Sequence, residues 1–507
     1  MYGIGLDVGT TGCKAAIFDE KGNSYGKSYE EFDIICLKPV WAEQDPFIVM
    51  QSVKKVIKEA VARAVAGGVS KKDILALSVS VLGEEIMPVD KDFNPLRNAI
   101  LGMDYRASCE TDILAEAVDR KRIYDITGFV PHPMASLPTI MWMRRHEPLL
   151  KERTWRYVSF TEYIMRELGA EIPCIDYPQA GRTMAFDINR KKWSSELLKA
   201  AGIEEDMFCE AVETGTAVGK LSKKMAEELG LTENVELVAG GQDQTCAALG
   251  AGLTEEFIGM DSHGTIEGIG VMSHKKVTDD LAFRGGVSCY CYTIPDTSFL
   301  MASSQVGGLL LKWFKNNFSL AETTEAKQSG RNVYDVMTSH VKNEPSRVMV
   351  LPHFIGSGPP WNDLDSKGAI VGLTIDSTRH DVVKAIMDSL TYEFRINVEY
   401  FEKMGFHMKE MRVVGGASKS DFWMQLKSNI LNREVSTQKE KDAACLGAAM
   451  IALKARGVYK NLYEAVHICV KTDRRYEPDP KQVKDYEQAY QKYTHLYGAL
   501  REFNKMK

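Results

Sequence analysis

The sequence lacks several features that would assign its class directly. Its ten cysteines include no CxxC pair, and Cys289 and Cys291 have no second pair with which to complete a metal site. No basic segment precedes an apolar one near the N-terminus, which argues against a signal peptide. The longest apolar run, 443–453, has about half the length of a membrane-spanning helix. We therefore expect a cytoplasmic protein with reduced thiols and no membrane partner.

An excess of positive charge is also missing. The chain has 63 basic and 69 acidic residues, which gives a formal net charge of −6 at pH 7. Non-specific binding to nucleic acid needs a basic face that displaces counterions, so no nucleic-acid partner is expected. The 507 residues exceed what one hydrophobic core normally organises, and no low-complexity linker interrupts them. The composition therefore indicates a globular protein with more than one domain.

Apolar periodicity predicts alternating strands and helices. Three strands separated by short polar turns open the chain, and this order is typical of an antiparallel meander rather than of a strand–helix–strand unit. Later segments alternate between buried strands and helices with apolar residues at every third or fourth position. The predicted strands are 2–8, 14–19, 24–34, 74–81, 235–239 and 258–262, and the predicted helices are 46–66, 108–118, 138–144, 244–252, 421–432 and an amphipathic tail from 480 onward.

A glycine-threonine turn with an aspartate before it occurs twice. Asp7 precedes Gly9 and Thr10, and Asp261 precedes Gly264 and Thr265 half a chain later. Two similar halves, each opening with a strand pair around such a turn, are the simplest explanation. We therefore predict two domains, 1–250 and 251–507, the second of which ends in the C-terminal helix.

The first of these turns has the chemistry of a phosphate site. Segment 7–14 offers the backbone amides of a glycine turn, the hydroxyls of Thr10 and Thr11, and the charge of Lys14. Asp7, at the end of the strand, is placed to hold Mg²⁺ through water. An ordinary polar hairpin is the structural alternative. Segment 22–28 looks like a P-loop but has one residue too few between its glycines, so we reject it.

Two further strand ends carry glycines and lead into helices. Asp243 would begin a helix whose dipole keeps the carboxylate ionised, so it could accept a hydroxyl proton during phosphoryl transfer. A plain helix N-cap is the alternative. In segment 413–418, Gly415 and Gly416 would admit a flat base or ribose close to the backbone, or they could form a structural turn. Three glycine turns at strand ends favour a nucleotide site more than any one of them does.

Taken together, these segments resemble the FGGY carbohydrate kinases, the family of glycerol kinase, xylulokinase and gluconokinase. The resemblance covers nearly the whole chain, about residues 2 to 500, and its landmarks occur in the family's order. The matching segments are 7–11, 41–46, 127–128 with 132–133, 176–177, 241–243, 264–265, Gly308 with Trp313, 368–373, 415–417 and 447–449.

The resemblance implies an α/β fold of two ribonuclease-H-like domains, of the actin/hexokinase type, with a central cleft for ATP and substrate. It implies a carbohydrate kinase that uses Mg²⁺ and ATP to phosphorylate a hydroxyl of a small sugar, sugar acid or polyol. Asp243 matches the catalytic base, and Asp7 matches the acid that organises Mg²⁺. The implied ATP-binding residues are Gly9, Thr10, Thr11, Lys14, Gly264, Thr265, Gly308, Gly415, Gly416 and Ala417. The implied substrate-binding residues are Glu84, Glu85, Asp104, Arg106, His132, Asp176, Gln242 and Asp243.

The substrate pocket departs from the subgroups. Segment 79–85 has neither the Gln-Met-His-Gly run of xylulokinases nor the Asn-Gln-Arg-Glu run of glycerol kinases, and only Glu84 coincides with the latter. The acids at 84, 85 and 104 suit hydroxyl recognition and disfavour an anion unless Arg106 or Arg182 neutralises them, and solvated surface carboxylates are the alternative. Ketopentoses, tetritols, gluconate-like acids and deoxy sugars stay open as substrates, as does a homodimer. A non-catalytic ATP- or sugar-binding regulator and an actin-like ATPase are the competing functions.

Overall fold

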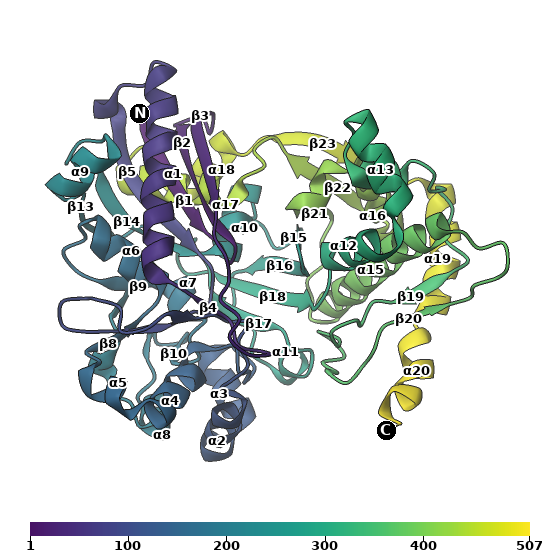
Figure 1. Cartoon of the computed structure of the whole chain (residues 1–507), viewed down its shortest axis with the longest axis horizontal. Coiled ribbons are helices and arrows are strands. Elements are labelled where there is room, and N and C mark those ends of the chain that lie inside the picture. Colours follow the sequence, from purple (N-terminus) through teal and green to yellow (C-terminus); the bar gives the residue numbers. More distant parts are fainter. Residues whose placement is uncertain (507) are drawn as a thin grey trace.

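The computed structural model describes residues 1–506 as two α/β halves, each built on one large sheet (Figure 1). The sheet of the first half has the strand order β13-β14-β5-β1-β2-β3. Its strands are β1 (Tyr2–Val8), β2 (Gly12–Asp19), β3 (Ser24–Glu31), β5 (Ile74–Val81), β13 (Ala217–Lys220) and β14 (Glu236–Gln242).

The sheet of the second half has the order β17-β18-β16-β15-β21-β22-β23. Its strands are β15 (Ile258–His263), β16 (Glu267–Ser273), β17 (Ser288–Cys291), β18 (Ser298–Ser304), β21 (Glu410–Val414), β22 (Glu434–Gln438) and β23 (Thr472–Tyr476). Shorter two-stranded sheets join β4 (Glu43–Gln44) to β7 (Ala99–Ile100), β6 (Met87–Val89) to β8 (Arg156–Val158), β9 (Cys174–Asp176) to β12 (Glu210–Val212), β10 (Phe186–Asp187) to β11 (Lys192–Trp193), and β19 (Met349–Leu351) to β20 (Ala369–Val371).

The two large sheets share one strand pattern. In the first, β3, β2 and β1 pair antiparallel, and β1, β5 and β14 pair parallel. In the second, β18, β16 and β15 pair antiparallel, and β15, β21 and β22 pair parallel. The predicted α/β fold with two related halves is therefore confirmed, as is the antiparallel opening of the chain.

Helices cover both sheets. Those of the first half are α1 (Pro46–Ala66), α2 (Ser108–Val118), α3 (Arg120–Thr127), α4 (Ser136–His146), α5 (Pro148–Arg153), α6 (Phe160–Leu168), α7 (Tyr177–Ala180), α8 (Ser195–Ala201), α9 (Lys223–Leu229) and α10 (Asp243–Ala251). Those of the second half are α11 (Asp280–Arg284), α12 (Gly308–Phe318), α13 (Leu320–Ser329), α14 (Val333–Thr338), α15 (Arg379–Lys403), α16 (Asp421–Leu431), α17 (Ala443–Ala455), α18 (Leu462–Cys469), α19 (Pro480–Tyr493) and α20 (Leu496–Lys505). Short 3₁₀ helices lie at Lys71–Asp73, Glu205–Met207 and Gly416–Lys419.

Helix α17 belongs to the second half in sequence but packs on the sheet of the first half, beside α10 (Figure 1). The two helix backbones approach very closely. A Cβ added at Gly250 would lie 1.8 Å from the carbonyl oxygen of Ala443, and one at Gly447 would lie 2.0 Å from that of Cys246. Only glycine allows this approach, so the two halves are joined by a tight helix–helix contact as well as by the chain.

The predicted ends of several elements need adjustment. The third strand ends at Glu31 rather than at 34, and the helix predicted at 138–144 begins at Ser136. The tail divides into α19 and α20, and the side chains of Tyr486, Tyr490 and Tyr493 are buried, as expected of a helix that packs back on the body. Within residues 1–506, no helix is both long enough and apolar enough to cross a membrane.

Candidate active site

Three acidic side chains lie at the same edge of the first sheet. Strands β1, β5 and β14 are parallel neighbours, and their register aligns Asp7 with Ser80 and Ser80 with Gly241. Glu84 follows the end of β5, and Asp243 follows the end of β14. In α/β sheets this carboxyl edge is where ligands bind. The structure therefore brings Asp7, Glu84 and Asp243 to one place from three distant parts of the sequence.

Asp243 is the first residue of α10 and is partly exposed. Burial of its carboxyl group raises its pKa from 3.8 to about 7, and the negative charges of Asp7 and Glu84 act in the same direction. Gln242 donates a hydrogen bond from its Nε2 to Oδ1 of Asp243. A carboxyl group with a pKa near neutrality is suited to take up and release a proton.

Asp7 is held by one hydrogen bond, 2.8 Å long, which the Ser80 hydroxyl donates to its Oδ1. Burial raises the pKa of Asp7, while the Ser80 bond and the charge of Lys14 oppose this increase. A divalent cation near this carboxylate would offset the same cost of burying a negative charge. The carboxylate is therefore suited to a hydrated Mg²⁺ ion.

The turn between β1 and β2 carries the predicted phosphate contacts. The Gly9 amide donates to the carbonyl of Gly12 (2.9 Å), which closes the turn. Thr10 and Thr11 lie at its tip, and Thr11 is exposed. Lys14 extends from β2 and donates to Oδ1 of Asp442 at 3.0 Å, so its ammonium group already has a partner from the second half of the chain.

The glycines predicted to contact nucleotide come together in the second half, at the carboxyl edge of β15 and β21. The Gly308 amide, at the start of α12, donates to the carbonyl of Gly264 (2.9 Å), and the Leu309 amide donates to that of Thr265 (3.1 Å). Gly415 has φ +90°, and a Cβ there would lie 2.5 Å from the carbonyl oxygen of His263. The two strand-end turns therefore touch.

Gly416 differs from its neighbour Gly415. No atom lies within 4 Å of a Cβ built at Gly416, whereas Ala417 is buried. The backbone at Gly416 therefore borders open space, as expected of a surface that a flat ring could approach.

Glu84 forms a buried ion pair with Arg182. The Nε and Nη2 of Arg182 both contact Oε1 of Glu84. The guanidinium group also lies 4.3 Å from the ring centre of Phe129 and 4.8 Å from that of Tyr290. Its Nη1 is buried without a partner among the described residues. Most of the positive charge of Arg182 is therefore offset by Glu84.

Glu85 and Asp176 are fully buried behind the edge on which Glu84 lies. Glu85 Oε1 accepts from the Phe160 amide (2.9 Å), and burial raises its pKa well above its usual range. Asp176 Oδ1 accepts from the Gln179 amide (2.8 Å) as the N-cap of α7, and burial raises its pKa to about 7. Both carboxyl groups are thus hydrogen-bonded within the protein, whereas the resemblance implied contacts with substrate.

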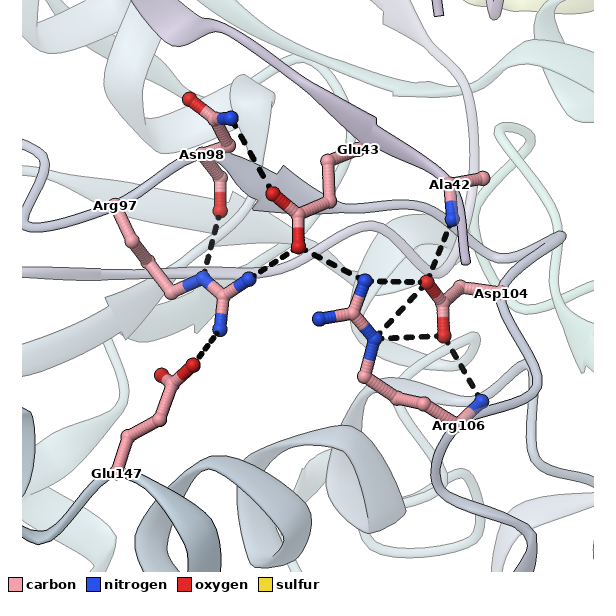
Figure 2. Close-up of polar contacts among 7 residues, drawn as sticks. All are labelled: Ala42, Glu43, Arg97, Asn98, Asp104, Arg106 and Glu147. Carbon is pink, nitrogen blue, oxygen red and sulfur yellow. Dashed lines mark hydrogen bonds and ion pairs between the residues drawn. The ribbon is translucent and has the colours of Figure 1, made fainter. Parts of the chain in front are cut away.

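Asp104 and Arg106 belong to the charged network shown in Figure 2. Asp104 accepts from the Ala42 amide at 2.7 Å and from the Arg106 amide at 2.9 Å, and its two oxygens also receive the Arg106 side chain. Arg106 pairs in addition with Glu43 at 2.8 Å and stacks on Trp41. Asp104 and the Nε–Nη2 edge of Arg106 are thus occupied by the protein itself, whereas Nη1 of Arg106 is buried without a partner among the described residues. The resemblance implied substrate contacts for both residues.

His132 lies near Arg182. Burial, together with the positive charge of Arg182, lowers the pKa of its imidazole to about 4. Its Nδ1 accepts a hydrogen bond from the Met134 amide (3.2 Å), and its ring packs edge-on against Tyr105. A neutral imidazole can exchange hydrogen bonds with a hydroxyl group without adding charge.

Asp261, the counterpart of Asp7 in the second sheet, has a different environment. It lies with His263 and Glu267 in a buried group whose ligand atoms are close enough to hold a metal ion. The ammonium group of Lys427, itself fully buried, bonds both carboxylates. Because Lys427 already occupies the place of a cation, this cluster is a buried ion-pair network rather than a second metal site.

Sequence reasoning missed the contribution of Tyr290. Its hydroxyl donates to Oε1 of Gln242 at 3.0 Å and so reaches the first half of the chain from β17. No local pattern identifies this tyrosine, because its partner lies 48 positions away in the sequence.

The sequence and the fold are similar to those of known proteins. Residues 2–250 match the model of the N-terminal domain of the FGGY family of carbohydrate kinases, and residues 259–456 match that of its C-terminal domain. A xylulose kinase of Staphylococcus epidermidis is 27% identical over 98% of this chain and 97% of its own. A gluconokinase of Bacillus subtilis is 26% identical over 96% and 93%. The crystal structure of a ligand-bound xylulose kinase from Lactobacillus acidophilus, 22% identical, superimposes with a TM-score of 0.88 over 99% of this chain and 98% of that one.

Proposed function

The chain belongs to the FGGY family of carbohydrate kinases, and from this membership we propose that it phosphorylates a hydroxyl of a small neutral sugar or polyol with ATP. The family assigns it to the phosphotransferases with an alcohol acceptor. The observation that carries the proposal is the shared position of Asp7, Glu84 and Asp243 at one sheet edge.

We assign the role of general base to Asp243. Its pKa of about 7 lets it be ionised at neutral pH and still accept the proton of an attacking hydroxyl. Phosphoryl transfer depends mainly on positioning and charge stabilisation, so one well-placed carboxylate is enough for the proton transfer.

Asp7 is the candidate for holding Mg²⁺ through water, and its partly exposed carboxylate, which accepts a hydrogen bond from Ser80, fits that task. When bound, Mg²⁺ would neutralise negative charge on the phosphates of ATP. The turn at Gly9–Thr11 would donate to phosphate oxygens, and the paired turns around Gly264 and Gly415 would hold the nucleotide. Lys14 would contribute charge after exchanging its contact with Asp442.

The charges at the site favour a neutral substrate, with a ketopentose or a tetritol as the leading candidates. Arg182, whose positive charge acts on Asp243, is already paired with Glu84, so little of that charge is left for a substrate anion. A substrate carboxylate would therefore meet net negative charge. Two relatives of similar sequence identity are named xylulose kinase, after a neutral ketose, and gluconokinase, after a sugar acid. The prediction therefore distinguishes between these two classes of substrate.

The test is a coupled ADP-release assay with ketopentoses, tetritols, glycerol and gluconate. We expect the best neutral substrate to exceed gluconate by about 100-fold in kcat/KM, because like charges brought together cost several kcal/mol. Preference for gluconate would refute the charge argument. ADP release that no acceptor stimulates would instead indicate an ATPase, and no turnover with any acceptor would indicate a binding protein.

Asp243→Asn tests the base directly. We expect kcat to fall by about 100-fold or more while the affinity for ATP changes little, because the amide cannot take up the proton. Glu196→Gln is the matched control, since Glu196 is also an acid in the first turn of a helix but pairs with Arg122 at the surface. An Asp243→Asn enzyme that keeps more than about a tenth of the rate would remove Asp243 from this role.

A further inference from the structure

Asp243 is linked to the second half of the chain by a short series of hydrogen bonds. The Tyr290 hydroxyl donates to Gln242 Oε1 (3.0 Å), and Gln242 Nε2 donates to Asp243 Oδ1. We infer that Tyr290 is a positioning residue that acts through Gln242 to hold the Asp243 carboxylate in one orientation. The inference rests on the proposed function and adds to it a residue from the second sheet.

The orientation of the Gln242 amide follows from its neighbours. The Gln244 backbone amide can only donate, and it lies 3.1 Å from Oε1 of Gln242. The buried Tyr290 hydroxyl donates to the same oxygen at 3.0 Å. With two donors directed at one end of the amide, that end is the oxygen, and the NH₂ group must face Asp243.

This orientation suits a general base. An N–H donor on Oδ1 stabilises the ionised carboxylate, whereas a flipped amide would direct its oxygen at the same atom and repel it. The other charged groups that act on Asp243 are Asp7 from β1, and Glu84 and Arg182 from the segments after β5 and α7. None of these fixes the Gln242 amide, so the Tyr290 hydroxyl is the side-chain group that does.

Tyr290 is itself held firmly against the first half. On one side of it in β17, the Cys289 amide donates to the carbonyl of Gly128 at 2.8 Å. The Tyr124 hydroxyl donates to the carbonyl of Val287 at 2.6 Å. A Cβ added at Gly181 would lie 3.0 Å from the Cβ of Tyr290, so the segment after α7 packs closely against Tyr290. The hydroxyl is therefore presented to Gln242 by a rigid support.

The substitution Tyr290→Phe removes the hydroxyl and keeps the ring. We expect kcat to fall about tenfold, the acid limb of the kcat/KM profile for the sugar to move to higher pH, and the KM for ATP to stay within about twofold. Tyr292→Phe is the matched control, because the Tyr292 hydroxyl is equally buried but donates to the carbonyl of Leu253, away from Asp243.

A double-mutant cycle tests whether the effect passes through Gln242. Gln242→Met removes the amide and keeps the side-chain length. If the inference holds, Tyr290→Phe has little further effect in the Gln242→Met background, because the two groups act in series. Additive effects, or a Tyr290→Phe enzyme with wild-type kcat and pH profile, would overturn it.

The Asp243→Asn and Tyr290→Phe enzymes together distinguish a failure of this inference from a failure of the proposed function. An inactive Asp243→Asn enzyme together with an unperturbed Tyr290→Phe enzyme would retain Asp243 as the base and discard only the link to Tyr290. An active Asp243→Asn enzyme would discard both.

Discussion

Replacing Asp176 with asparagine separates a buried structural acid from a substrate contact. Asp176 has no exposed surface, its Oδ1 caps α7, and its Oδ2 is buried without a partner in the described chain. Asparagine can make the same cap, because its side-chain oxygen accepts the Gln179 amide equally well. The substitution therefore removes the ionisable group and leaves the local hydrogen bond in place.

The expected magnitude follows from the pKa of Asp176. Burial raises it from 3.8 to about 7, so the folded chain keeps this proton at pH values where the unfolded chain has lost it. Between these two pH values the free energy of unfolding of the wild-type protein falls as the pH rises, by up to about 1.4 kcal/mol per pH unit. Asparagine does not titrate. The stability of Asp176→Asn relative to the wild type should therefore increase by about 3 kcal/mol between pH 5 and pH 8.

The assay is urea unfolding of both proteins at pH 5, 6, 7 and 8, with the KM for the sugar measured at each pH. The growth of the difference with pH is the diagnostic quantity, because it cancels effects of the substitution that do not depend on pH. Asp279→Asn is the control, since Asp279 caps α11 in the same way but is exposed. A difference that stays constant with pH, or a KM for the sugar raised more than about tenfold, would refute the structural role.

Three further predictions concern packing, buried charge and nucleotide binding. Gly447→Ala should destabilise the protein by about 1–3 kcal/mol in urea unfolding through overpacking at α10, whereas Gly498→Ala, in open space on α20, should stabilise it by about 0.5–1 kcal/mol. Lys427→Met should cost about 3–5 kcal/mol in urea unfolding, because it leaves two buried carboxylates without their cation. Gly416→Leu should raise the KM for ATP without lowering stability, whereas Gly415→Ala should lower the unfolding midpoint as well.

The elements that position the site could be predicted from local sequence, because the signals that define them are local. The strand Tyr2–Val8, the helix Pro46–Ala66 and the strand Ile74–Val81 have the predicted bounds, since alternation, apolar spacing and turn residues each act over a few positions. The glycine turns were found for the same reason. Gly415 has a φ of +90°, a conformation that favours glycine, so the residue type itself indicates the turn.

The direction of side chains could not be predicted in the same way. Glu84 and Glu85 are adjacent, yet one pairs with Arg182 at the site and the other bonds the Phe160 amide behind it. This difference depends on the backbone of Glu84, whose φ of +71° turns the chain at the end of β5. The bond from Tyr290 to Gln242 is equally invisible, because only the docking of β17 on the first half brings them together.

The repeated Asp-Gly-Thr turn shows how far internal symmetry can guide assignment. Asp7 and Asp261 occupy related strands, but a serine hydroxyl contacts Asp7, whereas the buried ammonium group of Lys427 contacts Asp261. The Asp7 carboxylate forms no ion pair within the described residues and can still take a cation, whereas the Asp261 carboxylate is already paired with Lys427. The two strands therefore have the same place in the topology, but their aspartates have different contacts. These contacts decide which of the two turns can hold Mg²⁺.

The same criterion sorts the acids around the sheet edge. Glu85 and Asp176 are fully buried and held by backbone amides, and burial raises the pKa of both, so they can be carried as neutral groups in the interior. Asp7 and Asp243 also have raised pKa values but stay partly exposed at the carboxyl edge. A raised pKa alone does not distinguish a catalytic acid from a structural one. Access to a ligand does distinguish them. Among these four acids, Asp7 and Asp243 have this access, and they are the two that the proposed phosphoryl transfer requires.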